Sequence, residues 1–132
     1  MNFEAKSFDH EKHYPVIANW FEARGLPCPA IANLPHIGCL VESAGKPIAA
    51  GFMFQTETPN VVIGNLISDR SADKQTRSNA VDFLILNLGQ AAKYMGKKAV
   101  LCSSNFEPAK VHFEKLGFEV VEENVTIYRR EI

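Results

Sequence analysis

The sequence of 132 residues has no long hydrophobic run, and no apolar stretch approaches the roughly 20 residues that a membrane-spanning helix needs. Its start, MNFEAK, lacks the apolar core of a secretory signal peptide. An excess of one charge is lacking too: the formal net charge is −1, whereas a nucleic-acid-binding surface would need many more basic residues. We therefore expect a cytoplasmic protein that binds neither membranes nor nucleic acids.

The residue types that bind metals or form disulfides are few and poorly spaced for either purpose. The three cysteines, Cys28, Cys39 and Cys102, are odd in number and far apart, and the last two lie in apolar runs. Such cysteines are typical of small buried residues in a reducing compartment. The stretch HEKH at residues 10–13 places its histidines three apart, one residue short of the zinc motif H-E-x-x-H, so we expect no metal site.

Apolar residues, by contrast, occur throughout: 46% of the chain is hydrophobic, enough for the core of one ordinary domain over residues 1–132. No linker, repeat or low-complexity tract interrupts it. The apolar periodicity and the positions of glycine, proline and capping residues predict the order β-α-β-β-β-α-β-α-β-β. The predicted strands cover residues 2–8, 37–42, 48–55, 61–67, 98–103, 118–121 and 125–128, and the predicted helices cover residues 9–25, 81–96 and 108–117.

This order indicates an α/β (α+β) fold with a mixed sheet, antiparallel at first and then extended by βα units, and with helices on both faces. The continuous apolar middle of the strand at residues 98–103 indicates a strand covered on both faces. The last two strands are expected to form a hairpin around Glu122, Glu123 and Asn124. Where the strands of such a sheet separate, ligands tend to bind at their carboxyl ends.

One stretch changes character abruptly: KQTRSNAVDF, at residues 74–83, passes from polar and basic to apolar and helical. A loop that runs into a helix exposes backbone N–H groups without intrahelical partners, and these groups suit a phosphate. Loops with this task usually carry glycine, and this stretch has none. Two interpretations stay open. Either the stretch holds a phosphate, or Ser78 or Asn79 is the N-cap of a helix and Lys74 and Arg77 are solvated.

Three features together resemble the GNAT superfamily of N-acetyltransferases, over nearly the whole chain. They are the order of elements, the hairpin return GKPIAAGF at residues 45–52 and the helix ending FEKLGF at residues 113–118. The acyl-coenzyme A loop of that family reads Q/R-x-x-G-x-G/A. Gln75 and Ala80 match its first and last positions, whereas Ser78 replaces its first glycine. The added Cβ is harmless at a negative φ and damaging at a positive one.

The resemblance implies a cofactor site for acetyl-coenzyme A, used as a co-substrate. The loop would cradle the pyrophosphate, the end of the preceding strand would pair with the pantetheine arm, an aromatic residue would pack beside the thioester, and a polar residue would contact the coenzyme. The implied residues are Gln75, Thr76, Arg77, Ser78, Asn79 and Ala80 for the pyrophosphate, Leu66, Ile67 and Ser68 for the pantetheine arm, Phe113 for the thioester, and Asn105 for the polar contact. Arg77 and Lys74 would help to neutralise phosphate charge.

The same resemblance leaves the catalytic residues unassigned. Phe113 stands where many members have a tyrosine that protonates the departing thiolate, and phenylalanine has no proton to give. The third meander strand lacks the glutamate that often serves as general base, and we expect the flanking Glu57 and Asp69 to be turn or surface residues. Either Phe113 is a packing aromatic that decides nothing about catalysis, or the chain is a weak or inactive transferase. Lost acid–base help costs about 10²–10⁴-fold, and orientation of two substrates can supply more.

The leading hypothesis is an N-acetyltransferase that moves acetyl from acetyl-coenzyme A to a small-molecule or peptide amine, by direct attack in a ternary complex. The second hypothesis is a GNAT-fold binding or structural module that lacks transfer chemistry. The third is an unrelated α+β domain whose final hairpin pairs with a partner chain. An edge strand at residues 126–130 would also be able to support a homodimer.

Overall fold

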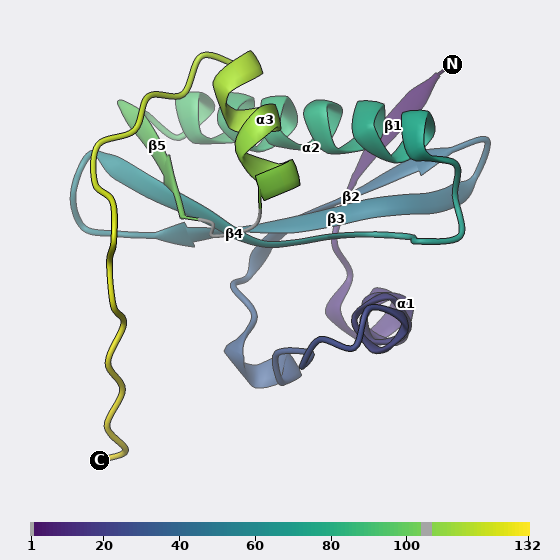
Figure 1. Cartoon of the computed structure of the whole chain (residues 1–132), viewed down its shortest axis with the longest axis horizontal. Helices are drawn as coiled ribbons and strands as arrows, with labels where there is room; N and C mark the ends of the chain where they lie inside the picture. Colours follow the sequence, from purple (N-terminus) through teal and green to yellow (C-terminus); the bar gives the residue numbers. More distant parts are fainter. Residues whose placement is uncertain (1, 104–106) are drawn as a thin grey trace.

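The chain folds into a five-stranded mixed sheet, seen in a computed structural model that describes residues 2–103 and 107–132 (Figure 1). The strands lie side by side in chain order; β1 to β4 are antiparallel and β5 is parallel to β4. The elements are β1 (Phe3–Ser7), α1 (His10–Ala23), the 3₁₀ helix η1 (Ile31–Asn33), β2 (Ile37–Ser43), β3 (Lys46–Gln55), β4 (Asn60–Ser68), α2 (Lys74–Tyr94), β5 (Ala99–Cys102) and α3 (Glu107–Lys115). The predicted mixed sheet and its antiparallel meander are confirmed.

Helices cover both faces of this sheet, as the sequence predicted: α2 and α3 lie over one face and α1 over the other (Figure 1). Each face has its own core, because successive side chains of a strand point to opposite sides. On β2, Val41 packs under α2 while its neighbour Leu40 packs against α1, and neither is accessible to solvent. The largest buried side chains of the two cores are Phe52, Ile17, Leu40, Met53, Ile63, Leu84 and Leu88.

Local signals set the start of α1 and the turn between β2 and β3. Asp9 is the N-cap of α1, and its carboxylate accepts a hydrogen bond from Lys12 N at 3.1 Å. Ala44 and Gly45 have φ angles of 52° and 78°. Two positive φ values at the centre of a two-residue hairpin define the turn type whose twist matches the flanking strands. Both features fall where the sequence predicted them.

The start of α2 was predicted wrongly. The helix begins at Lys74, so the stretch from Gln75 to Ala80 is not a loop but the first turns of a helix. Its N-cap is Asp73, whose carboxylate accepts from Thr76 N at 3.0 Å and from the Thr76 hydroxyl. Neither Ser78 nor Asn79 is the cap. With the Asp73 cap, the helix begins about two turns before Val81, where the predicted helix starts.

The final hairpin was also predicted wrongly. Gly117, with a φ of 87°, ends α3 as expected, but residues 118–132 form no strand and run extended away from the sheet (Figure 1). All side chains from Glu119 onward are exposed. A two-stranded hairpin without a neighbouring layer is marginally stable in water, and the adjacent carboxylates of Glu122 and Glu123 at its expected turn repel each other.

The expectation that β5 is covered on both faces is wrong as well. Ala99 and Leu101 are exposed, whereas Val100 and Cys102 pack partly against the core under α2. Within the described residues β5 has only one neighbour, β4, so it forms an edge of the sheet. Its continuous apolar run therefore reflects one buried face and one open face.

Candidate functional site

The candidate site lies along the second half of β4, where β5 stops pairing with it. β5 pairs with β4 from Asn60 to Ile63, and the last matched pair is Ile63 with Cys102. Residues 64–68 continue to pair with β3, but no described residue pairs with them on the β5 side. A strand with one free edge offers main-chain N–H and C=O groups to an extended ligand. This open half of β4 includes Leu66, Ile67 and Ser68, the residues implied for the pantetheine arm.

An irregularity in the pairing of β3 and β4 marks the start of the open half. The register shifts between Ala50 and Phe52, so that Gly51 lies opposite both Asn65 and Leu66. Asn65 has a φ of 53°, the left-handed conformation that asparagine tolerates better than most residues. Such a bulge bends a strand and increases its twist. The bulge at Asn65 occurs two residues after Ile63, the last residue of β4 that pairs with β5. β4 and β5 separate in this region.

Gly51 permits this bulge because a side chain there would collide with the opposite strand. A Cβ on Gly51 would overlap Leu66 Cδ2 and lie 3.2 Å from Leu84 Cδ2. Leu66 is thereby folded over the backbone of β3 towards the core under α2, while the neighbouring Ile67 is buried on the α1 side. The side chains of the open half are thus held by both cores, and its main chain remains at the free edge.

Arg24 lies at the end of the open half and contacts Ser68. This residue caps the C-terminus of α1, and its Nε and Nη2 both donate to Ser68 O at 3.3 Å. Nη2 also donates to the Ser68 hydroxyl at 2.9 Å. The Ser68 carbonyl, implied as a main-chain partner of the coenzyme, is therefore already engaged. Sequence reasoning missed this contact because the two residues are 44 positions apart and no local motif links them.

Two more arginines join Arg24 at the corner between α1, β4 and α2. Arg70 Nη1 donates to Ala23 O at 3.1 Å, and Arg77 Nη1 donates to Arg70 O at 2.9 Å. We call Arg24, Arg70 and Arg77 the arginine corner. Burial, and then repulsion from Arg77 and Arg70, lower the pKa of Arg24. Over residues 2–103 and 107–132 no arginine of the corner forms an ion pair with a carboxylate.

The N-terminus of α2, expected to cradle a pyrophosphate, already holds a negative charge of its own. Asp73 has a lowered pKa because the hydroxyl and N–H of Thr76 donate to its carboxylate. Gln75 Nε2 donates to Asn79 Oδ1 at 3.0 Å on the helix surface, while Thr76 and Ala80 point inward and are buried. Ser78 is half-buried within the helix, where φ is negative, so its Cβ causes no strain. The residues that match the motif lie within the first turns of α2, and their binding of a pyrophosphate stays a prediction.

Helix α3 is attached to α2 by a polar group that sequence reasoning did not identify. The Asp82 carboxylate contacts His112 Nδ1 and Lys115 Nζ, each at 2.6 Å. Burial raises the pKa of Asp82, but the bonds from Lys115 and His112 outweigh burial, so the pKa lies below its ordinary value. His112 and Lys115 are 30 and 33 positions from Asp82 in the sequence. Charged residues are common on helix surfaces, so the sequence does not indicate which of them will meet.

Phe113 is a packing residue in this arrangement. It lies against the core under α2, and its ring is 5.4 Å from that of Phe118. The structure shows that Phe113 packs against the core, and its contact with a thioester and its bearing on catalysis stay predictions. Asn105, the other residue implied from this part of the chain, lies outside the described residues.

The thiols near the site are unsuited to nucleophilic catalysis. Burial raises the pKa of Cys102, at the corner where β5 leaves β4, to about 11, and it raises that of Cys39 to about 11 as well. Only the thiolate is a good nucleophile, so both groups are inert near neutral pH. All three cysteines are free, and the described part of the chain contains no group of three histidine, cysteine or acidic residues that would hold a metal.

Asp69, which directly follows the open half of β4, and His10 and His13 at the start of α1 each have a structural hydrogen bond. Asp69 accepts from Ser71 N and the Ser71 hydroxyl, which confirms the expected turn role. His13 Nδ1 accepts from Asp9 N at 2.9 Å, and His10 Nε2 lies 2.8 Å from Pro35 O, so both stabilise the start of α1. His36 lines a shallow hollow between η1 and the ends of β2 and β3.

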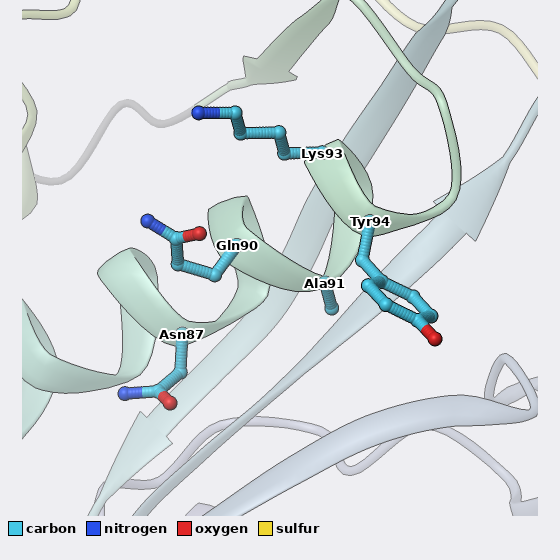
Figure 2. A pocket seen from close by; sticks show the side chains of 5 residues that line it. All are labelled: Asn87, Gln90, Ala91, Lys93 and Tyr94. Carbon is cyan, nitrogen blue, oxygen red and sulfur yellow. The ribbon is translucent and has the colours of Figure 1, made fainter.

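A second hollow lies on the outer surface of α2, and Figure 2 shows that a single helix supplies all of its lining. Asn87, Gln90 and Lys93 extend outward from the helix, and Tyr94 is almost fully exposed. A surface with no second wall cannot orient two substrates, so this hollow is not the candidate site. Among the helices of residues 2–103 and 107–132, none is long and apolar enough to cross a membrane.

Comparison with known proteins identifies the fold. No family model matches the sequence, and no curated protein matches it. The aminoglycoside N-acetyltransferase AAC(6′)-Iy, in complex with a bisubstrate analogue of coenzyme A, has a TM-score of 0.74 and 13% identity over 100% of both chains. An acetyltransferase of Trypanosoma brucei has a TM-score of 0.68 and 16% identity over 97% of this chain and 100% of its own. Glucosamine-6-phosphate N-acetyltransferase of Arabidopsis thaliana has a TM-score of 0.64 and 17% identity over 97% of this chain and 99% of its own. The chain has the fold of the GNAT acetyltransferases, as the resemblance predicted.

Proposed function

We propose that this protein is an N-acetyltransferase that moves acetyl from acetyl-coenzyme A to an amine in a ternary complex. One observation carries the proposal: in a fold shared with acetyltransferases, no described residue pairs with the β5-side edge of β4 at residues 64–68, close to the start of α2. The amide groups of a pantetheine arm are suited to pair with such an edge. Because main-chain pairing tolerates many side chains, it agrees with a chain that departs from the family motif.

The reaction is a direct displacement at the thioester. The uncharged amine nitrogen attacks the carbonyl carbon, a C–N bond forms, the C–S bond breaks, and the proton lost by the amine balances the proton gained by the thiolate. No cysteine near the site is a competent nucleophile, since the pKa of Cys102 is raised to about 11. Direct attack therefore fits this chain better than an acyl-enzyme, and catalysis would depend mainly on orientation of the two substrates.

Individual residues would contribute unequally. Main-chain groups of successive strand residues alternate between the two sides, and because Asp69 N donates to Ile48 O, Ile67 turns its own groups towards Ala50 of β3. Leu66 would pair with the arm, whereas the Ser68 carbonyl would first have to lose its bonds to Arg24. Phe113 would pack beside the thioester and supply no proton. The acceptor would be a small-molecule amine, as in neighbours whose names describe aminoglycoside and sugar substrates, or a peptide amine. A cytoplasmic location, a single acyl-coenzyme A domain over residues 1–132 and a homodimer all stay predictions.

The decisive experiment is a titration with acetyl-coenzyme A, followed by calorimetry and thermal shift, and then an acetyl-transfer assay against a panel of amines. At 100 times its dissociation constant the ligand should stabilise the protein by about 2.7 kcal/mol. Turnover without a covalent acetyl adduct in the intact mass spectrum is the expected result. The absence of both binding and transfer at millimolar coenzyme would contradict the proposal.

A binding or structural module is the second candidate, and two observations favour it. Asp73 places a carboxylate at the N-terminus of α2, where anions would otherwise bind, and Phe113 has no proton to donate. This candidate predicts coenzyme binding without transfer, or no coenzyme binding at all. Saturable binding with no product from any amine would favour the module over the enzyme.

A further inference from the structure

The outer edge of β1 is open to solvent. β1 lies at the opposite edge of the sheet from β5, and in the described part of the chain β2 is its one strand partner. Phe3 is half-buried, and the rest of the strand, residues 4–7, is exposed. Natural proteins usually protect such an edge with a bulge, a proline or a covering segment, because a free edge pairs with other chains. β1 has no proline, and its register with β2 is unbroken from Phe3 to Ser7.

Every second residue of β1 turns its main-chain groups to this free edge. Phe8, which directly follows the strand, donates its N–H to Gly38 O at 2.9 Å. In an antiparallel pair, residues that exchange hydrogen bonds alternate with residues whose groups face the other way. The even-numbered residues of β1 therefore face β2, and the odd-numbered ones face outward. The N–H and C=O groups available to another strand are those of Phe3, Ala5 and Ser7.

The charges of β1 favour one register with a second copy of the same strand. A two-fold axis at Ala5 sets Ala5 opposite Ala5 of the other copy, so that the outward groups of both strands meet. Glu4 then lies opposite Lys6 of the second copy, in the non-hydrogen-bonded kind of pair, where side chains are closer together. A shift by one residue sets outward groups against inward ones. A shift by two sets Glu4 against Glu4 or Lys6 against Lys6, and these like charges repel.

We propose that β1 pairs antiparallel with β1 of a second copy and joins the two five-stranded sheets into one. The pairing gives Glu4 a cation: in one copy it lies opposite Glu42 of β2 and forms no ion pair within the described residues. Lys6 Nζ lies 2.7 Å from Glu42 Oε1, yet the Lys6 side chain is 53% exposed. An ammonium has three donors, so it can contact Glu42 of its own chain and Glu4 of the other.

This dimer differs from the one that the sequence predicted, and it leaves the candidate site free. Residues 126–130, the edge expected to support a homodimer, form no strand. The open half of β4 lies towards the other edge of the sheet, so the inference does not rest on the proposed function. Two short strands make a small interface, and we expect a dissociation constant in the micromolar range.

The test is analytical ultracentrifugation of the untagged full chain at low salt, over a range of concentrations. The wild type should dimerise, and Glu4→Lys and Lys6→Glu should each weaken the dimer about tenfold or more, because each sets like charges opposite each other. Mixed in equal amounts, the two variants set opposite charges against each other at both positions and should associate again. Ile127→Asp, in the extended C-terminal segment, is the control and should change nothing. Thermal melts separate lost association from lost folding.

A crosslink tests the register itself. Ala5→Cys places two thiols opposite each other across the axis, at about the 5.5 Å Cα separation that a disulfide bridges, and should give a covalent dimer on mild oxidation. Ser7→Cys lies opposite Phe3 of the second copy and should not. A wild type that stays monomeric up to about 1 mM overturns the proposal. A dimer that survives Glu4→Lys or is lost in Ile127→Asp, or a mixture that does not associate although both variants fold, overturns it as well.

Discussion

The two halves of β4 differ in how they are held, although they belong to one strand. The closed half, residues 60–63, pairs with β3 on one side and β5 on the other, and Val61 and Ile63 are inaccessible to solvent. The open half, residues 64–68, has β3 as its one strand partner in the part of the chain that the structure describes, and it ends in polar contacts between Arg24 and Ser68. Apolar burial involves no titrating group and no partner that a ligand can replace, whereas polar contacts can be exchanged for those of a ligand.

One strand can thus combine a buried segment that is paired on both sides with a segment whose polar edge contacts a ligand can replace. The change from one to the other is made by two residues, the left-handed Asn65 and the side-chain-free Gly51 opposite it. Substitutions in the closed half should therefore act on stability, and those in the open half should act mainly on ligand binding.

The largest effect is expected from Ile63→Ala in the closed half. Ile63 is 1% exposed and packs in the core under α2, so the truncation should lower the free energy of unfolding by roughly 2–5 kcal/mol. Chemical denaturation of the purified variant measures this. Val62→Ala is the matched control, because Val62 is half-buried on the opposite face and should cost much less. Equal losses for the two variants would contradict the assigned faces of β4.

The next effect tests the bulge itself. Gly51→Ala should lower stability by about 1–3 kcal/mol, because the new Cβ overlaps Leu66 and must push it out of place. Gly89→Ala, inside α2 with nothing within 4 Å of its Cβ, should instead gain up to about 1 kcal/mol from helix propensity. Thermal melts of both variants measure these changes in stability. If Gly51→Ala left the stability unchanged, Leu66 would not need to fold over β3.

The strands and helices themselves were mostly readable from the sequence, whereas the long-range contacts of the open half of β4 were not. Alternating and continuous apolar patterns, the Asp9 cap and the Ala44–Gly45 turn are local signals, and each gave the element in its right place. The Arg24–Ser68 contact joins residues 44 positions apart, and the bulge at Asn65 depends on which residue of β3 lies opposite. Asp73 lies three residues before Thr76, the spacing of an N-cap, so the start of α2 at Lys74 also had a local signal in the sequence.

The attachment of α3 to α2 should make part of the stability depend on pH. Because the folded pKa of Asp82 is below its ordinary value of 3.8, its contribution is present above about pH 5 and is lost as pH falls through the folded pKa. Asp82→Asn should cost about 1–2 kcal/mol near neutral pH, a figure that allows for the exposure of Lys115, and little in acid. Denaturant titrations of both proteins from pH 3 to pH 7 give the difference. A constant difference across that range would exclude the carboxylate charge as its source.

The smallest effect is expected from Ser68→Ala, at the end of the open half. This variant tests whether Arg24 leaves Ser68 or stays on it when the coenzyme binds. Ser68→Ala removes the bond from Arg24 Nη2 to the hydroxyl but leaves the two bonds to Ser68 O, so it should cost only about 0.5–1 kcal/mol of stability. If Arg24 must leave Ser68 before an acyl-coenzyme pairs with the β4 edge, a weaker hold should tighten coenzyme binding by about two- to fivefold. Calorimetry on the variant measures this gain directly. An unchanged dissociation constant would mean that Arg24 stays on Ser68 in the bound state and that the arm does not pair with the Ser68 carbonyl.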